Sequence, residues 1–318
     1  MTQQAAPEFA LARFRDGDAV RLGLVSRGRI RALAPDELGA PDLNAFLGSP
    51  DWARLEALAE TDGGWRELAD VTLTAPVEPR QVLQAGANYR EHVVQLIVGG
   101  LTPDETRTPE DARAFATKLM DDRAANGEPY FFIGMPACVV GDDVPLVLPG
   151  YSDVHDWELE LAIVIGREAF RVSRDDALSH VAGYTIVNDI TTRDLVFRKD
   201  MKEIGTDWYR SKNAPGFLPT GRFLVPATVV DPSDLAIRLE LNGDVMQDST
   251  TADLMFDVPA LISAASQTMP LLPGDLLLTG SPPGNGQHWK RFLRDGDVMS
   301  ASIAGLGTQV VRCVSVPS

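Results

Sequence analysis

The chain has 318 residues, of which 44% are hydrophobic and 23% are charged, and its formal net charge at pH 7 is −16. This length can bury a substantial core in one large domain, or in a small domain beside a larger one, and the composition is that of a globular protein. The acidic balance argues against a nucleic-acid binder, because no basic cluster is present to displace counterions from phosphates, and no apolar run is long enough to span a membrane.

The cysteines and the first residues bear on the compartment of the protein. Cys138 and Cys313 lie in apolar runs, without the spacing of metal ligands or of a redox pair, so we expect buried free thiols. The first residues lack the charged and then apolar pattern of a signal peptide. Together these features predict a cytoplasmic protein.

The start of the chain reads as a small α+β module. Residues 8–33 alternate between apolar and polar side chains and contain glycine turns, which predicts short hairpins. Two short helices are expected, near 43–46 and 51–59. The proline-interrupted segment 72–79 reads as a connector. We therefore predict two domains, with boundaries 1–75 and 76–318.

Residues 82–128 combine a strand, a helix and a charged excursion. The run 82–89 is apolar and predicts a buried strand that leads into a turn, and a helix is expected from Arg90 onward, with His92 in its first turns. The polar stretch 97–128 contains a second predicted helix, which Thr108 caps. An insertion of this kind acts either as a lid over a site or as a surface spacer.

The segment 155–166 is an apolar, β-branched run that ends at Gly166, which predicts a strand. Successive side chains of a strand alternate between its faces, so Glu158 and Glu160 share one face at a spacing of roughly 6.5–7 Å. Two carboxylates so placed can lean toward one hard cation such as Mg²⁺, Mn²⁺ or Ca²⁺. The competing interpretation is a half-exposed strand with two glutamates on its solvent face.

A third carboxylate follows the next apolar strand. The run 181–187 leads directly into Asn188 and Asp189. Three acidic groups delivered by two strands are the usual provision for an octahedral cation with open water positions. We expect a helix to begin at 191–195, and the remainder of the chain to contain strands and short helices.

Six short motifs, taken in order, resemble those of the fumarylacetoacetate hydrolase family. They are Asn88-Tyr89-x-x-His92, Glu158-x-Glu160, Asn188-Asp189 followed by Arg193-Asp194, Arg210-Ser211-Lys212, Gly274-Asp275 and Thr279-Gly280-Ser281-Pro282-x-Gly284. No single motif is decisive, but the ordered set is specific. The resemblance covers residues 80–318, and the N-terminal module is similar to the small leading domain of many members.

The resemblance implies a mixed α/β, β-rich fold, a β-roll with short helices behind the small module, and a homodimer. It implies a divalent cation, Mg²⁺ or in its place Mn²⁺ or Ca²⁺, on Glu158, Glu160 and Asp189. Substrates of the family are small anionic keto acids, often β-diketo acids that chelate the cation. The implied function is hydrolysis of a carbon–carbon bond with an enolate leaving group. Decarboxylation, isomerisation and keto–enol tautomerisation occur on the same scaffold, so the fold does not settle the reaction.

The resemblance also implies roles for five further residues. His92 would take a proton from water, since histidine titrates near neutral pH, and Lys212 would hydrogen-bond a developing oxyanion. Arg193 would grip a carboxylate, and Tyr89 and Ser281 would contact the substrate. Each has an ordinary structural alternative: in the same order, a backbone-bonded histidine, a solvated lysine, an ion pair with Asp194 or another acid, a core tyrosine and a tight turn.

The chain departs from the hydrolytic members of the family in three places. Members that resemble acylpyruvases carry a glutamate three residues after the histidine, and here that residue is Gln95, which we include among the catalytic candidates. A neutral amide can orient a water but cannot stabilise an imidazolium as a carboxylate does. Val196 replaces a glutamine, and the lysine expected near Met135 is absent.

Three explanations of these departures compete. Hydrolysis persists if an acid of the insertion folds over the site, the candidates being Asp104, Glu105, Glu110 and Asp111. Alternatively the reaction needs no activated water, as in decarboxylation, isomerisation or tautomerisation of a keto acid. The third explanation is a ligand-binding protein without catalytic activity.

Overall fold

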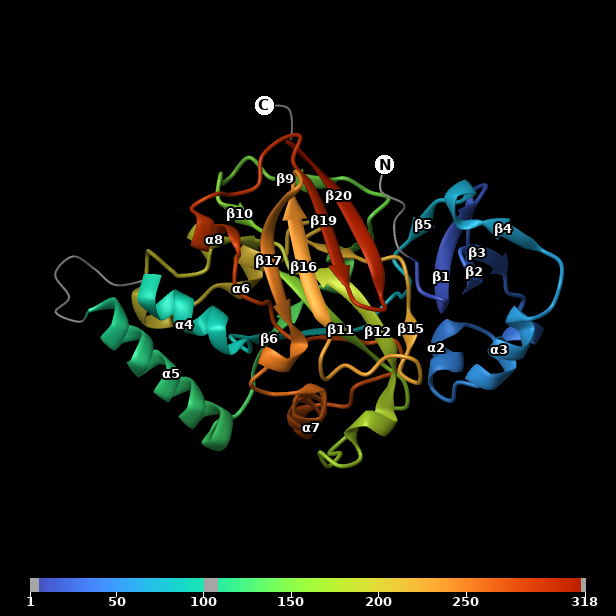
Figure 1. Cartoon of the computed structure of the whole chain (residues 1–318), viewed down its shortest axis with the longest axis horizontal. Helices are drawn as coiled ribbons and strands as arrows, with labels where there is room; N and C mark the ends of the chain where they lie inside the picture. The colour runs from blue at the N-terminus through green and yellow to red at the C-terminus, as the bar shows by residue number, and fades with distance from the viewer. Residues whose placement is uncertain (1–5, 100–107, 316–318) are drawn as a thin grey trace.

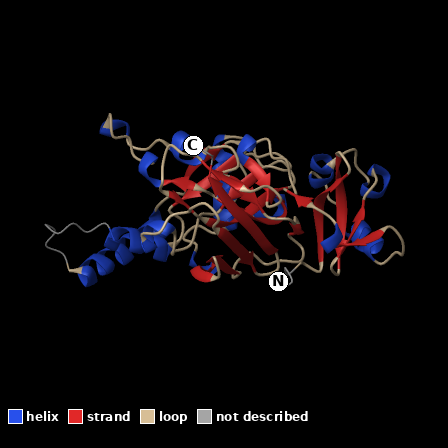
Figure 2. Cartoon of the chain, turned by 90° about the horizontal axis from the view of Figure 1, so that it is seen from above, coloured by secondary structure: helices blue, strands red, loops and turns tan. Residues whose placement is uncertain are grey.

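The computed structural model describes residues 6–99 and 108–315. The N-terminal module lies at one end of the molecule, two β-sheets form the centre, and a pair of helices projects at the other end (Figures 1 and 2). The fold is mixed α/β and rich in strands, as expected. Within the described ranges, no helix is long and apolar enough to cross a membrane.

The N-terminal module contains a five-stranded antiparallel sheet in the order β4-β3-β2-β1-β5. The predicted hairpins and both predicted helices are confirmed, and Asp51 caps the second helix by accepting a hydrogen bond from the Arg54 amide at 3.0 Å. The elements are β1 (Phe9–Asp16), β2 (Ala19–Ser26), β3 (Arg29–Ala32), α1 (Pro35–Leu38), α2 (Leu43–Leu47), α3 (Trp52–Ala59), β4 (Trp65–Glu67), a 3₁₀ turn (Leu68–Asp70) and β5 (Leu73–Thr74).

The module is joined to the rest of the chain by packing as well as by its connector. The backbones of Leu11 and Leu224 exchange hydrogen bonds of 2.9 and 2.8 Å. One buried apolar cluster contains Leu55 of the module together with Val164 and Leu278 of the larger part. The predicted boundary near residue 75 stays a prediction, since the core is continuous across it.

Two sheets form the larger part of the chain. The first is eight-stranded, with the order β7-β6-β18-β11-β12-β14-β8 and with β15 also paired to β12, and the second runs β17-β16-β19-β20-β9. The strands of the first are β6 (Val82–Gly86), β7 (Tyr130–Gly134), β8 (Val139–Gly141), β11 (Leu159–Ile165), β12 (Val181–Asn188), β14 (Leu218–Thr220), β15 (Val225–Pro226) and β18 (Leu276–Leu278). Those of the second are β9 (Leu146–Leu148), β16 (Ala236–Leu241), β17 (Asp244–Thr250), β19 (Val298–Ile303) and β20 (Gly307–Ser315).

Short helices and a two-stranded ribbon complete this part. The ribbon pairs β10 (His155–Asp156) with β13 (Thr191–Thr192). The α-helices are α4 (Arg90–Gly99), α5 (Pro109–Asn126), α6 (Trp208–Lys212), α7 (Val258–Thr268) and α8 (Gly286–Trp289), and the 3₁₀ turns are Pro136–Cys138, Ala177–His180, Arg193–Leu195, Lys202–Ile204 and Thr251–Asp253.

Strand β11 is buried on both of its faces. Leu161 and Ile163 pack in the same apolar cluster as Ile237 of the second sheet. On the opposite face, Ala162 and Val164 pack in the cluster that includes the N-terminal module. Glu160 belongs to this second face by alternation, and Glu158 directly precedes the strand. The two residues are only 2% and 7% exposed, so the solvent-face interpretation of the pair is wrong.

Two predicted elements differ from the structure. The predicted strand 155–166 is interrupted at Trp157 and Glu158, where the chain leaves the ribbon and enters the large sheet. The helix expected at 191–195 is absent, because the β-branched pair Thr191–Thr192 forms a strand against β10, and only a 3₁₀ turn follows it. The expected buried free thiols, Cys138 and Cys313, are confirmed.

The described part of the 97–128 insertion packs on α4. Val94 of α4 forms a small apolar cluster with Ala116 and Met120 of α5. Arg113 adds an ion pair with Glu91 at 2.7 Å. The two helices therefore form the projecting pair seen in Figures 1 and 2.

Candidate active site

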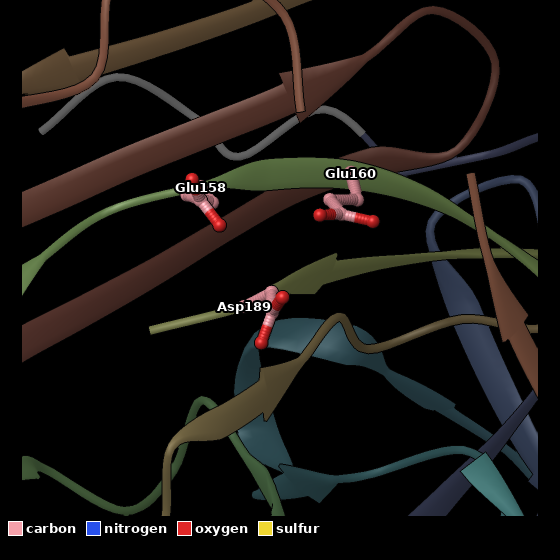
Figure 3. Close-up of side chains that lie close together, drawn as sticks. All are labelled: Glu158, Glu160 and Asp189. Carbon is pink, nitrogen blue, oxygen red and sulfur yellow. The ribbon is translucent and has the colours of Figure 1, made fainter. Parts of the chain in front are cut away.

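Glu158, Glu160 and Asp189 gather where β11 begins and β12 ends. Because the two strands are antiparallel, with Leu159 opposite Asn188, the residues flanking this pair are neighbours. One carboxylate oxygen from each of the three acids lies within 4.8 Å of the others. Figure 3 shows both glutamates pointing toward Asp189 from the neighbouring strand. All three side chains are buried.

Backbone and side-chain hydrogen bonds hold the three acids in place. The Glu158 amide donates to Asn188 Oδ1 at 2.8 Å, and the Asp189 amide donates to the Glu158 carbonyl at 2.8 Å. The Gly280 amide donates to Glu160 Oε2 at 2.7 Å, and Thr191 Oγ1 donates to Glu158 Oε2 at 3.1 Å. The carboxylates are therefore positioned by the fold itself.

Two cationic side chains reach the same cluster. Lys212 Nζ donates to Glu158 Oε2 at 2.5 Å and to Asp189 Oδ2. Arg193 donates from Nη2 to Glu158 Oε1 and from Nε to Asp156 Oδ2, each at 2.6 Å. Lys212 is 2% exposed, so the alternative of a solvated lysine is wrong.

Arg193 forms the ion pair that was its structural alternative, although Asp194 is not the partner. Asp194 instead accepts a hydrogen bond from Ser152 Oγ at 2.7 Å. Because Nε and Nη2 of Arg193 are engaged with Asp156 and Glu158, its predicted role in gripping a substrate carboxylate stays a prediction.

The cluster carries more negative than positive groups. It contains four carboxyl groups, on Asp156, Glu158, Glu160 and Asp189, against the cations of Arg193 and Lys212. Burial and the charge of Asp189 raise the pKa of Glu160 well above its usual range. Burial also raises the pKa of Asp189, although Lys212 acts against it. Burial would do the same to Glu158, but Arg193 and Lys212 outweigh it and lower the pKa of that carboxyl.

A divalent cation fits this donor set. Two carboxyl groups remain unbalanced in a buried place, and Asp189 Oδ1 is buried without a hydrogen-bond partner. Donors that are all oxygen suit Mg²⁺, Mn²⁺ or Ca²⁺. Glu158, Glu160 and Asp189 would hold the ion. The oxygen donors indicate a hard divalent cation and do not choose among these three ions.

His92 is brought to the same cavity by α4, which lies between β6 and the projecting helix α5. The cavity is lined by residues of β6, α4, β7, α6 and the acid cluster, and the lining comprises Ala85, Gly86, Ala87, His92, Leu96, Tyr130, Phe132, Glu158, Glu160, Asp189, Arg193, Trp208, Lys212 and Ser281. Burial lowers the pKa of His92 to about 4, although Glu158 acts against it. The expectation that His92 titrates near neutral pH is therefore wrong, because the imidazole is desolvated and faces Arg193 and Lys212 as well as Glu158.

Two other predicted site residues do not reach the cavity. Gln95 lies one helical turn after His92, but it is not part of the lining, and its Oε1 is buried without a partner. Tyr89 is fully buried, and burial together with the charge of Glu160 raises its pKa. The catalytic role of Gln95 and the substrate contact of Tyr89 stay predictions.

Ser281 lines the cavity, and its hydroxyl is hydrogen-bonded to Gln247. Gln247 Nε2 donates to Ser281 Oγ at 2.9 Å and to the Pro282 carbonyl at 2.8 Å. Its Oε1 accepts from the Leu159 amide at 3.1 Å. Gln247 thus ties the start of β11 to the loop that carries Ser281.

The acids proposed for a lid do not reach the cavity in the described chain. Glu110 and Asp111 are exposed at the start of α5, and Asp111 accepts a hydrogen bond from Thr108 Oγ1 at 2.9 Å. None of residues 109–128 is part of the cavity lining. Asp104 and Glu105 lie outside the described residues, so the lid stays a prediction.

Asp156 and the aromatic lining were missed from the sequence. Asp156 is fully buried and accepts from the Gly286 amide at 2.5 Å, the Gln287 amide at 3.1 Å and Arg193. Asp156 lies two residues before Glu158, as Glu158 lies two residues before Glu160, so the same spacing could have included Asp156 among the candidates. Nothing local marks Gln247 or Trp208, since their neighbours in the site come from distant parts of the chain.

Comparisons with known proteins identify the family of this chain. Residues 81–314 match the family model described as fumarylacetoacetate hydrolase C-terminal. A mitochondrial oxaloacetate tautomerase of Xenopus laevis is 32% identical over 318 residues, which covers 96% of this chain and 91% of the relative. A 2,4-didehydro-3-deoxy-L-rhamnonate hydrolase of a Sphingomonas species is 43% identical over 186 residues, or 57% of this chain and 64% of that protein.

A solved structure extends the likeness to the whole chain. The crystal structure of a 2-hydroxyhepta-2,4-diene-1,7-dioate isomerase from Mycobacterium marinum has a TM-score of 0.71 and 31% sequence identity, and it covers 98% of this chain and 100% of that one. The names of these relatives include a tautomerase, a hydrolase and an isomerase, and one relative is mitochondrial, so a cytoplasmic location stays a prediction. The family model and these relatives show that this chain belongs to the fumarylacetoacetate hydrolase family of enzymes.

Proposed function

We propose that the chain hydrolyses a carbon–carbon bond in a small acylpyruvate, a β-diketo acid, with the help of a divalent cation. The observation that carries the proposal is the buried set of Glu158, Glu160 and Asp189 in one cavity with His92 and Lys212. Carboxylate oxygens supply the cation ligands, an imidazole supplies a base, and an ammonium supplies a hydrogen-bond donor. These are the components that cleavage beside a ketone requires.

The overall reaction adds one water across the bond between the acyl carbon and the methylene carbon. The acyl group leaves as a carboxylic acid, and the methylene carbon takes a proton and becomes the methyl group of pyruvate. Glu158, Glu160 and Asp189 would hold a divalent cation, which the 2-oxo acid would chelate and which would supply charge stabilisation. His92 is neutral at pH 7, because its pKa is about 4, so its ring nitrogen is free to accept the proton of water.

Lys212 is placed to stabilise the oxyanion of the reaction. Its ammonium group lines the cavity, is 2% exposed and is held by Glu158 and Asp189. Burial alone would lower the pKa of Lys212, but the charges of Asp189 and Glu158 outweigh burial and raise it, so the group stays protonated. A fixed donor in a water-poor site stabilises developing charge better than solvent does.

Product analysis tests the proposal. Benzoylpyruvate is incubated with protein and Mg²⁺, and ¹H NMR follows benzoate and pyruvate, which should appear in equal amounts. EDTA and the Glu160→Gln variant should each stop the reaction, because both remove the cation. Cleavage that continues unchanged in EDTA would contradict the proposed mechanism, and no pyruvate from any acylpyruvate would contradict the proposed reaction.

Keto–enol tautomerisation of a small 2-oxo acid is a second candidate, and Gln95 favours it. In the described lining, the only carboxyl groups belong to the acids of the proposed cation site, and Glu91, the acid next to His92 on α4, is not part of the lining and pairs with Arg113. Moving a proton between carbon and oxygen of an enol needs no activated water, so a weak base suffices. The enol form of oxaloacetate has a separate ultraviolet absorbance, and faster decay of that absorbance without pyruvate formation would assign this reaction instead.

We also propose that the chain forms a homodimer. Phe197, Ile204 and Tyr209, in the segment that leads into α6 and in α6 itself, are 68%, 59% and 70% exposed. Apolar side chains gathered on one segment are typical of a surface that meets another protein. Light scattering on the purified chain should give twice the 34.4 kDa of one copy, and a monomer at micromolar concentration would contradict this proposal.

A further inference from the structure

The outer wall of the cavity is aromatic and apolar. Tyr130 and Phe132 point to the same face of β7, since they are two residues apart on a strand, and both line the cavity. Trp208 of α6 stacks on Phe132 with ring centroids 4.6 Å apart and planes inclined by 16°. Leu96 of α4, one turn beyond His92, closes the same wall. Tyr130 and Leu96 are 45% and 38% exposed, so they form the rim of the cavity.

This wall starts beside the reacting groups. Lys212 Nζ lies 5.2 Å from the centroid of the Phe132 ring and 6.0 Å from that of Trp208. Tyr130 continues outward from Phe132, with a centroid separation of 6.1 Å. A substrate whose 2-oxo acid end reaches Glu158, Glu160 and Asp189 would therefore extend its other end along these rings.

Gly86 makes room for this arrangement. A Cβ atom on Gly86 would lie 2.6 Å from Cδ1 of Tyr130 and 3.4 Å from Cε1 of Phe132. Gly86 and Tyr130 are opposite each other in the pairing of β6 with β7. The missing side chain at residue 86 leaves the space that the Tyr130 ring occupies, so the backbone of β6 takes part in shaping the wall.

The described cavity offers no free cation to a second acidic group. Its two cationic side chains are Arg193 and Lys212. Arg193 is paired with Asp156 and Glu158, and Lys212 is paired with Glu158 and Asp189. A carboxylate at the far end of a substrate would lose its hydration against apolar rings without an opposite charge, which is unfavourable.

We propose that Tyr130, Phe132 and Trp208 select the acyl arm of the substrate, and that the arm is uncharged and apolar, an aryl or extended hydrocarbon group and not a second carboxylate. This inference rests on the proposed function, because it assumes that a 2-oxo acid is held at the acid cluster. It extends that function by naming the substrate class: acylpyruvates with an apolar arm. Aromatic side chains gain binding energy from contact with a planar apolar group, and roughly 0.5–1.5 kcal/mol is typical of a ring pair.

Three inhibitors with the same chelating end separate this inference from the proposed function. Oxamate binds a divalent cation through its carboxylate and amide oxygens and has no arm. N-benzyloxamate adds an aryl arm, and N-oxalylglycine adds a carboxylate arm. Binding to the full-length Mn²⁺-loaded chain is measured by calorimetry. The expected order of affinity is N-benzyloxamate, then oxamate, then N-oxalylglycine. Equal affinities, or tightest binding of N-oxalylglycine, would overturn the inference.

Variants on the two faces of β7 localise the effect. Tyr130→Ala should weaken N-benzyloxamate by roughly three- to tenfold and leave oxamate unchanged, because Tyr130 is on the rim, whereas Phe132 is the ring beside Lys212. Ile133→Ala is the matched control, since Ile133 lies on the opposite face of the same strand, is 70% exposed and does not line the cavity. Tyr130→Lys should reverse the order of the two armed inhibitors. An unchanged order in Tyr130→Lys, or equal losses in Tyr130→Ala and Ile133→Ala, would overturn the inference, whereas failure of oxamate itself to bind would contradict the proposed function.

Discussion

A divalent cation at Glu158, Glu160 and Asp189 should raise the thermal stability of the chain by several degrees. A ligand that binds only the folded state stabilises it by about 2.7 kcal/mol at a concentration one hundred times its Kd. The unfolding entropy is about 2.1 cal/mol/K per residue, or about 0.67 kcal/mol/K for 318 residues. The midpoint of unfolding should therefore rise by about 4 °C when Mn²⁺ or Mg²⁺ replaces EDTA.

The rise in the unfolding midpoint on addition of the cation should depend on Glu160 and on pH. Glu160→Gln keeps the shape and the acceptor for the Gly280 amide but removes one anionic ligand, so the variant should lose most of the response. Burial raises the pKa of Glu160 and of Asp189. In the metal-free protein, groups with raised acid pKa values contribute stability at low pH that is lost as pH rises through those values. The cation binds the ionised forms, so the difference in midpoint should grow between about pH 5 and about pH 8.

Differential scanning calorimetry of matched samples measures this shift. Glu168→Gln is the control, because Glu168 is an exposed glutamate just beyond β11 and is not part of the acid cluster. It should respond to the cation as the wild type does. An equal rise in Glu160→Gln, or a rise that shrinks as pH increases, would refute the assignment of the cation to these three acids.

Three further predictions concern the chemical groups. Lys212→Met should lower kcat by about 10²- to 10³-fold while Mn²⁺ still binds, because the variant lacks the donor to the oxyanion; a loss below tenfold in steady-state assays would contradict this role. At saturating metal, kcat/KM should fall only as the pH drops toward about 4, the pKa of His92, and a limb near pH 6.5 would show that His92 is more solvated than the structure indicates. Gln95→Glu should raise the pKa of His92, move this limb to higher pH and increase hydrolytic turnover; unchanged turnover with intact metal binding would favour tautomerisation.

The sequence predicted the parts of the site that follow from local patterns. The apolar run before Gly166 placed Glu158 and Glu160 on one face, the next apolar strand delivered Asp189, and together with the ordered family motifs these patterns indicated the acid cluster. The same reasoning left open whether that face meets solvent. Only the packing of β11 between two apolar clusters decides this, since burial on both faces arises from segments far away in the chain.

The rest of the site depends on contacts between distant segments. Gln247 is hydrogen-bonded to Ser281, and Trp208 stacks on Phe132. These partners are far apart in the sequence, so no local pattern predicts the contacts. The pKa of His92 also could not be predicted, because desolvation by neighbouring elements lowers it from the value typical of an exposed histidine. A helix was expected at 191–195, but Thr191 and Thr192 form a strand, because they pair with β10 from a distant part of the chain.

The central claim is that a cation on Glu158, Glu160 and Asp189 is required for chemistry on a 2-oxo acid in the adjoining cavity. The most direct measurement titrates metal-free protein with Mn²⁺ and records, in the same samples, bound Mn²⁺ by electron paramagnetic resonance and the initial rate of pyruvate release from benzoylpyruvate. Rate and occupancy should rise together to one equivalent per chain, and both should be lost in Glu160→Gln. A rate that reaches its maximum while the Mn²⁺ remains unbound would contradict a cation requirement at these three acids.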